Sequence, residues 1–180
     1  MRLTSGEQTI GNGVQRLLIK ERIMSYQNFR NAIELAKQCR YYTIKGERTN
    51  EVVAMAEELV GLNFSKQNYE FFKELGYLSF FGNEFFGICK DDFSGGHSGC
   101  AVEATIQDRK ELNLPPQWLT IYFFDDGYYG YLDYSQLNED REPPVIMAIY
   151  NGKEFVEVEK VAEDLGDFLL ELVKDQLANQ

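Results

Sequence analysis

The chain has 180 residues, enough for one domain with a buried core, and its hydrophobic content of 44% excludes a disordered protein. Its net charge of −11, from 29 acidic and 18 basic side chains, disfavours direct binding to the phosphate backbone of nucleic acid. No apolar run is long enough to cross a membrane, and residues 1–13 lack the apolar stretch of a signal peptide, so we expect a cytoplasmic protein.

The sequence offers few metal ligands. Cys39, Cys89 and Cys100 are odd in number and lack paired metal-ligand spacing, which indicates thiols in a reducing cytoplasm. His97 is the only histidine, so a zinc site would lack ligands. The adjacent carboxylate pairs do not have the spacing of a calcium-binding loop. We therefore expect no metal and no cofactor.

Helices are predicted first along the chain. Residues 1–24 are expected to form a mobile or helical extension, and residues 25–180 a single domain. Ser25 is a candidate N-cap for a helix that ends near Gln38. A short strand over 41–44 follows. Two further helices are indicated by apolar periodicity between capping residues, one from Thr49 or Asn50 to Gly61 and one from Ser65 to Gly76.

Strand-forming residues replace the helical pattern after Gly76. Strands are predicted over 78–81, 84–89 and 100–106. A loop is expected over 91–99 and one helical turn over 108–112.

Residues 118–134 carry the clearest local signal, a β-hairpin that turns at Asp126-Gly127. A two-residue loop would pair Phe124 with Tyr129, Tyr122 with Tyr131, and Ile121 with Leu132. Because side chains alternate along a strand, Ile121, Phe123 and Leu132 would then face the core. The opposite face would carry Tyr122, Phe124, Tyr129 and Tyr131, either as a recognition surface or beneath a covering helix.

The C-terminal part completes the predicted fold. A strand over 145–150, a turn at Asn151-Gly152 and a short strand at 155–156 lead to an amphipathic helix over 159–177. Helices followed by a meander and a closing helix predict a single α+β domain. Its antiparallel meander sheet would be packed by the N-terminal helices and the C-terminal helix.

A catalytic site is not indicated. His97 could pair with Cys89 or Ser98, but the surrounding glycines do not form a nucleophile elbow and lie in no strand-to-helix context. A small-molecule binder or hydrolase that uses His97 and Cys89 is therefore only a remote alternative.

The order of several short motifs resembles the SUKH superfamily, which includes bacterial immunity proteins and the fungal cell-wall assembly regulators. The resemblance covers residues 49–175 and leaves the first 24 residues outside. The chain departs from the family pattern at Leu62-Asn63-Phe64, where a Leu-Pro pair is usual, and at Leu75-Gly76-Tyr77. The matching motifs are Glu57-Glu58-Leu59-Val60-Gly61, Tyr69-Glu70-Phe71-Phe72, Phe85-Phe86-Gly87-Ile88, Trp118-Leu119, Asp125-Asp126-Gly127, Tyr131-Leu132-Asp133, Pro144-Val145 and Phe168-Leu169.

The resemblance implies an α+β fold without catalysis. In bacteria it implies a cytoplasmic immunity protein that binds and neutralises a cognate toxin, often a nuclease. The acidic surface fits a basic nuclease domain as the partner, because acidic groups can take the place of nucleic acid in a basic cleft. We expect the contact at the hairpin end and the nearby acids, with oligomeric state left open. The residues are Asp91, Asp92, Asp125, Asp126, Tyr128, Tyr129 and Tyr131.

A scaffold or regulatory module that recruits cellular proteins is the main alternative. The two roles differ in genetic context, because a toxin-neutralising protein should have a neighbouring gene for a large secreted toxin. A regulatory module should have several partners and no such neighbour.

Overall fold

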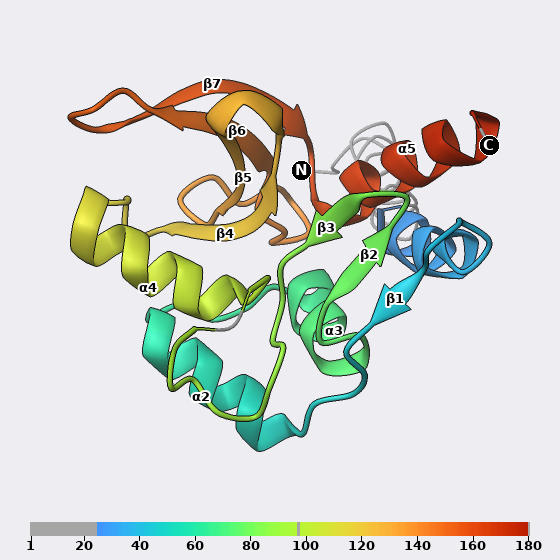
Figure 1. The fold of residues 1–180 in the computed structure, drawn as a ribbon, viewed down its shortest axis with the longest axis horizontal. Coiled ribbons are helices and arrows are strands. Elements are labelled where there is room, and N and C mark those ends of the chain that lie inside the picture. Colours follow the sequence, from blue (N-terminus) through green and yellow to red (C-terminus); the bar gives the residue numbers. More distant parts are fainter. Residues whose placement is uncertain (1–24, 97, 180) are drawn as a thin grey trace, which may run out of the picture.

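The computed structural model describes residues 25–96 and 98–179. Its centre is one sheet of seven antiparallel strands that follow one another in chain order (Figure 1). The strands are β1 (Thr43–Ile44), β2 (Leu78–Phe80), β3 (Asn83–Phe85), β4 (Trp118–Phe123), β5 (Tyr128–Asp133), β6 (Val145–Tyr150) and β7 (Phe155–Ala162). The predicted α+β class and antiparallel meander are confirmed.

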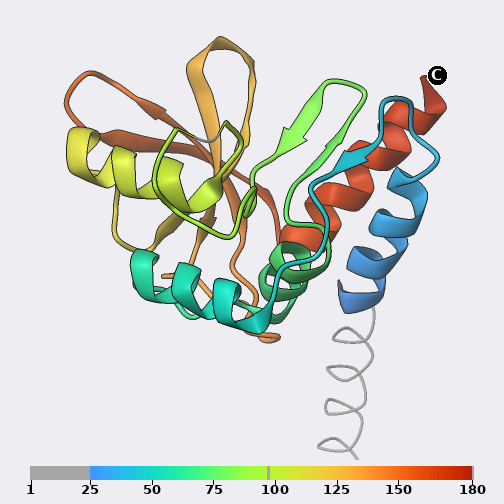
Figure 2. The ribbon, with the colours of Figure 1, turned by 60° about the horizontal axis from the view of Figure 1, so that its bottom comes forward.

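The described residues form five helices around this sheet, two at each end of the molecule and one between them. A helix over residues 25–36 lies beside α5 (Leu165–Ala178) at one end of the molecule, while α2 (Asn50–Val60) and α4 (Ala101–Leu112) lie together at the other (Figure 2). Between the two groups lies α3 (Lys66–Glu74). None of the described helices combines the length and the apolar character needed to cross a bilayer.

The ends of α2 and α3 form as their sequence signals predict. The Thr49 hydroxyl accepts a hydrogen bond from the Val52 N–H, and Gly61 ends α2 in the left-handed conformation. In α3 the Ser65 hydroxyl accepts from the N–H of Asn68. Capping of this kind satisfies backbone groups that the first and last helical turns leave without partners.

Two predictions of secondary structure are wrong. Residues 101–106 belong to α4 and not to a strand, because Ala101, Val102 and Thr105 are buried at helical spacing. The last helix begins at Leu165 and not near residue 159, since residues 159–162 complete β7. Asp164 caps α5 by accepting from the Asp167 N–H.

The β4–β5 hairpin is confirmed, but its predicted register is wrong. The loop has three residues, Asp125–Gly127, and the Phe124 N–H donates to the Tyr128 carbonyl at 2.8 Å. Phe123 therefore faces Tyr129, one position away from the expected pairing. Positive φ angles at Asp126 (61°) and Gly127 (82°) close the longer loop.

A β-bulge between Thr120 and Tyr122 then moves the register by one more residue. Ile121 and Leu132 face the main core as predicted. Tyr122 joins them on the core side, where its ring lies 5.0 Å from that of Phe85, whereas Phe123 is 45% exposed.

The core has two parts. The larger cluster lies between the sheet and the helices and includes Phe29, Phe72, Phe85 and Phe168. The smaller one consists of Leu114, Trp118, Tyr131, Ile146 and Ala148, on strands β4 to β6 and the segment before them.

Candidate partner-binding site

The residues predicted to contact a partner fall into exposed and buried groups. Asp91, Asp92 and Asp126 are exposed, whereas Tyr128 and Tyr129 are half-buried. The side chain of Asp125 lies outside the described part of the structure. Tyr131 is fully buried and so cannot contact a partner in this conformation.

The burial of Tyr131 follows from the bulge and the loop. Tyr131 pairs with Thr120 and not with Tyr122, so its ring faces the smaller core cluster. The ring lies 5.3 Å from that of Trp118 and 5.7 Å from that of Phe155. Burial raises the pKa of its hydroxyl, which has no hydrogen-bond partner among the described residues.

The structure brings the described loop residues 93–96 and 98–99 and the hairpin to the two sides of one groove. We call it the α4 groove. It has a volume of about 850 Å³ and lies between this loop, the outer side of α4 and the ends of β4 and β5. Its lining includes Phe93, Ile106, Asp108, Thr120, Phe123 and Tyr129.

Aromatic rings form part of its surface. Phe123 is 45% exposed, and its ring packs edge-on against Tyr129 with the centroids 5.0 Å apart. Ile106, on the helix side, is also exposed. Exposed apolar side chains that line a groove with polar neighbours are typical of a protein-interaction surface.

The half-buried carboxyl group of Asp108 also lines this groove. Burial, with a smaller contribution from the neighbouring Glu111, raises its pKa to about 6. The ionised carboxylate is disfavoured because burial removes hydrating water from it and no equivalent interaction replaces that water.

The two aspartates at the start of the loop, Asp91 and Asp92, are exposed. The carboxylate of Asp91 lies 3.7 Å from Arg48 Nε, and the Asp92 carboxylate accepts a hydrogen bond from the Ser94 hydroxyl at 3.3 Å. Arg48 also donates to the carbonyl oxygens of Ile88 and Cys89, which fixes the chain just before the loop. The loop is thus anchored on the side from which it enters the groove.

The cysteine proposed for the remote catalytic alternative is a poor nucleophile. Burial raises the pKa of the Cys89 thiol to about 11, so the thiol stays protonated at neutral pH. His97, its suggested partner, lies outside the described residues. Cys39, Cys89 and Cys100 are all free thiols, as predicted. Among the described residues, no group of three or more metal-ligating side chains forms a metal site.

One comparison with known families gives a match. A family model, SUKH_6, described as SMI1-KNR4 cell-wall, matches residues 50–169. This chain is a SUKH protein. The SUKH family is compatible with the role of an immunity protein or of a cell-wall regulator, and both roles depend on binding other proteins. No curated protein matches the chain.

The site residues missed by sequence reasoning are Ile106, Asp108, Thr120 and the exposed Phe123. Residues 108–112 were predicted as one helical turn, so Asp108 had no assigned neighbours. A helical pattern over 101–112, with Ala101, Val102 and Thr105 inward, would have placed Ile106 and Asp108 on the outer side of α4.

Proposed function

We propose that this SUKH protein is a non-catalytic binding protein that neutralises a cognate toxin. The observation that carries the proposal is the position of the α4 groove. Its aromatic lining comes from Phe93, in the loop that follows two exposed acids, and from the hairpin, which carries a third exposed acid, Asp126. Aromatic side chains supply binding energy in protein interfaces, and acidic groups around them increase the rate of encounter with a basic partner.

The proposed contact surface is the predicted one without Tyr131. It comprises Asp91, Asp92, Asp125, Asp126, Tyr128 and Tyr129, and we extend it to the α4 groove. Tyr129 belongs to both parts because it lines the groove at the hairpin end.

A nuclease domain is the partner class that this surface fits best. The substrate of a nuclease is polyanionic, so its active-site cleft carries basic residues. A net charge of −11 gives the present chain a field of the opposite sign. Binding at or near the cleft would exclude the substrate.

Growth rescue tests the proposal. The C-terminal domain of a large secreted toxin encoded by the neighbouring gene is expressed alone or with this protein. We expect co-expression to restore growth and the two proteins to purify as a complex. Unrestored growth with both proteins present and soluble would contradict toxin neutralisation.

The family description favours one second candidate, a regulatory module that recruits proteins of cell-wall assembly. This candidate predicts several partners in affinity purification and no toxin gene nearby. A single co-purified partner encoded by the adjacent gene would decide against it.

A further inference from the structure

One buried polar atom that lines the α4 groove has no hydrogen-bond partner within the described chain. Thr120 is only 1% exposed and lines the groove, yet its Oγ1 atom has no hydrogen-bond partner within the described chain. Tyr131 lies opposite Thr120 on the same face of the sheet, and its buried hydroxyl is also without a partner there. A buried hydroxyl without a partner is less favourable than a hydrogen-bonded one. Hydroxyl oxygens can accept hydrogen bonds from a ligand that carries N–H groups.

The charged groups of the groove favour a positive ligand. Its lining contains three carboxylates, Glu103, Asp108 and Glu111, and one amine, that of Lys110. Asp108 is poorly solvated, as its raised pKa indicates. A cation placed beside this carboxylate would stabilise its ionised form.

The aromatic rings that line the groove favour a guanidinium group over an amine. Phe93, Phe123 and Tyr129 line it together with the apolar Ile106. A guanidinium group stacks on aromatic rings, presents five N–H donors and forms paired hydrogen bonds to a carboxylate. A lysine amine is more strongly hydrated and makes no such planar contact.

We propose that the α4 groove binds an arginine side chain of the partner protein, with Asp108 as its carboxylate acceptor and the rings of Phe123 and Tyr129 beside it. The inference deepens the proposed function, on which it rests, by naming the chemistry of the partner segment. Arginine is also a frequent anchor in protein interfaces and in clefts that bind nucleic acid.

A small probe tests the groove directly. N-acetylarginine amide is titrated into the full-length ¹⁵N-labelled protein, with N-acetyllysine amide as the matched probe. We expect saturable shifts at groove residues, including Ile106, Thr120 and Tyr129, and binding of the lysine probe about ten-fold weaker or absent.

Two variants and one control locate the site. Asp108→Asn keeps the shape of the side chain and should weaken the arginine probe about ten-fold. Phe123→Ala removes an exposed ring that is not part of either core cluster and should weaken it several-fold. Glu58→Gln removes a carboxylate from the exposed side of α2 and should leave binding unchanged. Unshifted resonances outside the groove show that each variant is folded.

Three results would overturn the inference. The first is the absence of saturable shifts in the groove. The second is equal binding of both probes, and the third is unchanged binding by Asp108→Asn and Phe123→Ala.

Growth rescue separates this inference from the proposed function. A protein that rescues growth but does not bind the probe loses only the arginine site. A protein that binds the probe in the groove but rescues no growth loses the proposed function.

Discussion

Asp108 lines the candidate site, and the burial of its carboxyl group destabilises the folded protein when that group is ionised. Its carboxyl group is half-buried on α4, and its pKa is raised from 3.8 to about 6. The folded protein therefore binds the Asp108 proton more tightly than the unfolded chain does. Ionisation of this group lowers the free energy of unfolding as the pH rises through this interval. Binding sites commonly retain such residues at a cost in stability.

The change Asp108→Asn removes this ionisation. We expect the variant to be about 1–2 kcal/mol more stable than the parent at pH 7.5, a value reduced from the full shift because the group is partly solvated. The difference should shrink as the pH is lowered through this interval, and should vanish below about 3.8, where the parent carboxyl becomes protonated in both states. Urea unfolding at a series of pH values measures it. A variant that is less stable at pH 7.5, or a difference independent of pH, would contradict the assignment.

Gly87 is required by a close approach between two chain segments. A Cβ atom there would lie 1.9 Å from the carbonyl oxygen of Gly76, and backbone cannot move aside as a flexible side chain can. We expect Gly87→Ala to lower the free energy of unfolding by about 3 kcal/mol or more, measured by urea denaturation.

A second glycine provides the control for this change. Gly82 has a positive φ angle of 87° but open space around it, so Gly82→Ala should cost only about 1–2 kcal/mol of backbone strain. Equal losses for the two variants would show that the contact with Gly76 is not what requires glycine at position 87.

At the scale of elements, local signals predicted the helices whose ends carry their own caps. Thr49, Gly61 and Ser65 act within one helical turn, so their roles can be inferred from neighbouring residues. The start of α5 was missed because the apolar Val161, which belongs to β7, fits the apolar stripe of a longer helix. Asp164 and Asp167 marked the true start of α5.

The β4–β5 hairpin was only partly predictable from neighbouring residues. Asp126-Gly127 correctly predicted a turn, but both a two-residue and a three-residue loop accept these residues. The bulge at Ile121 depends on packing, since it places Ile121 and Tyr122 together in the main core. The α4 groove was not predicted because residues 101–112, which form one of its sides as α4, were assigned to a strand and a separate helical turn.

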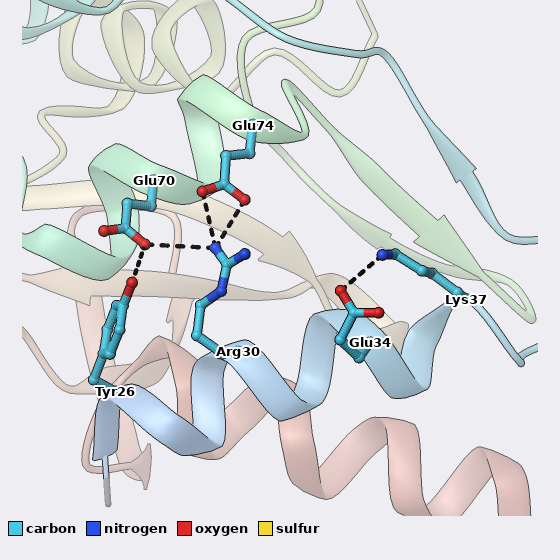
Figure 3. A network of polar contacts seen from close by, with 6 residues as sticks. All are labelled: Tyr26, Arg30, Glu34, Lys37, Glu70 and Glu74. Carbon is cyan, nitrogen blue, oxygen red and sulfur yellow. Dashed lines mark hydrogen bonds and ion pairs between the residues drawn. The ribbon is translucent and has the colours of Figure 1, made fainter. Parts of the chain in front are cut away.

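The helix over residues 25–36 lies outside the matched family region but is part of the packed structure. Phe29 and Ala32 on its inner side are fully buried. On the side that faces α3, Arg30 lies 2.8 Å from the carboxylate of Glu74 and 3.6 Å from that of Glu70, which also accepts from the Tyr26 hydroxyl (Figure 3). The helix is thus held in the domain by its buried apolar side and linked to α3 by polar contacts.

Two variants of this helix should differ strongly in stability. Phe29→Ala leaves a cavity in the main core and should lower the free energy of unfolding by about 3–5 kcal/mol. Arg30→Gln removes an ion pair that is partly open to solvent and should cost less than about 1 kcal/mol. Thermal or urea unfolding compares the two. A small effect of Phe29→Ala would show that the folded domain does not depend on this helix.

At the scale of the whole molecule, charge is expected to act on the rate of binding. Acidic groups are unevenly distributed, with 14 acidic against four basic residues in residues 125–180. An acidic field accelerates encounter with a basic partner and is screened by salt.

Two charge reversals separate local from global effects on the association rate. Asp126→Lys at the hairpin and Glu58→Lys on α2 change the net charge equally, and both side chains are exposed. We expect Asp126→Lys to slow association with the toxin domain several-fold more at low salt, and the difference to disappear at about 1 M salt. Stopped-flow mixing measures these rates. Equal slowing by both variants would place the contact away from the hairpin.

Titration of purified toxin activity with this protein tests the central claim most directly. The proposal predicts that the activity falls in proportion to the added protein and is abolished at an equimolar ratio, with a stable complex isolated from the mixture. Toxin activity that remains unchanged at a molar excess of the folded protein would contradict neutralisation by binding.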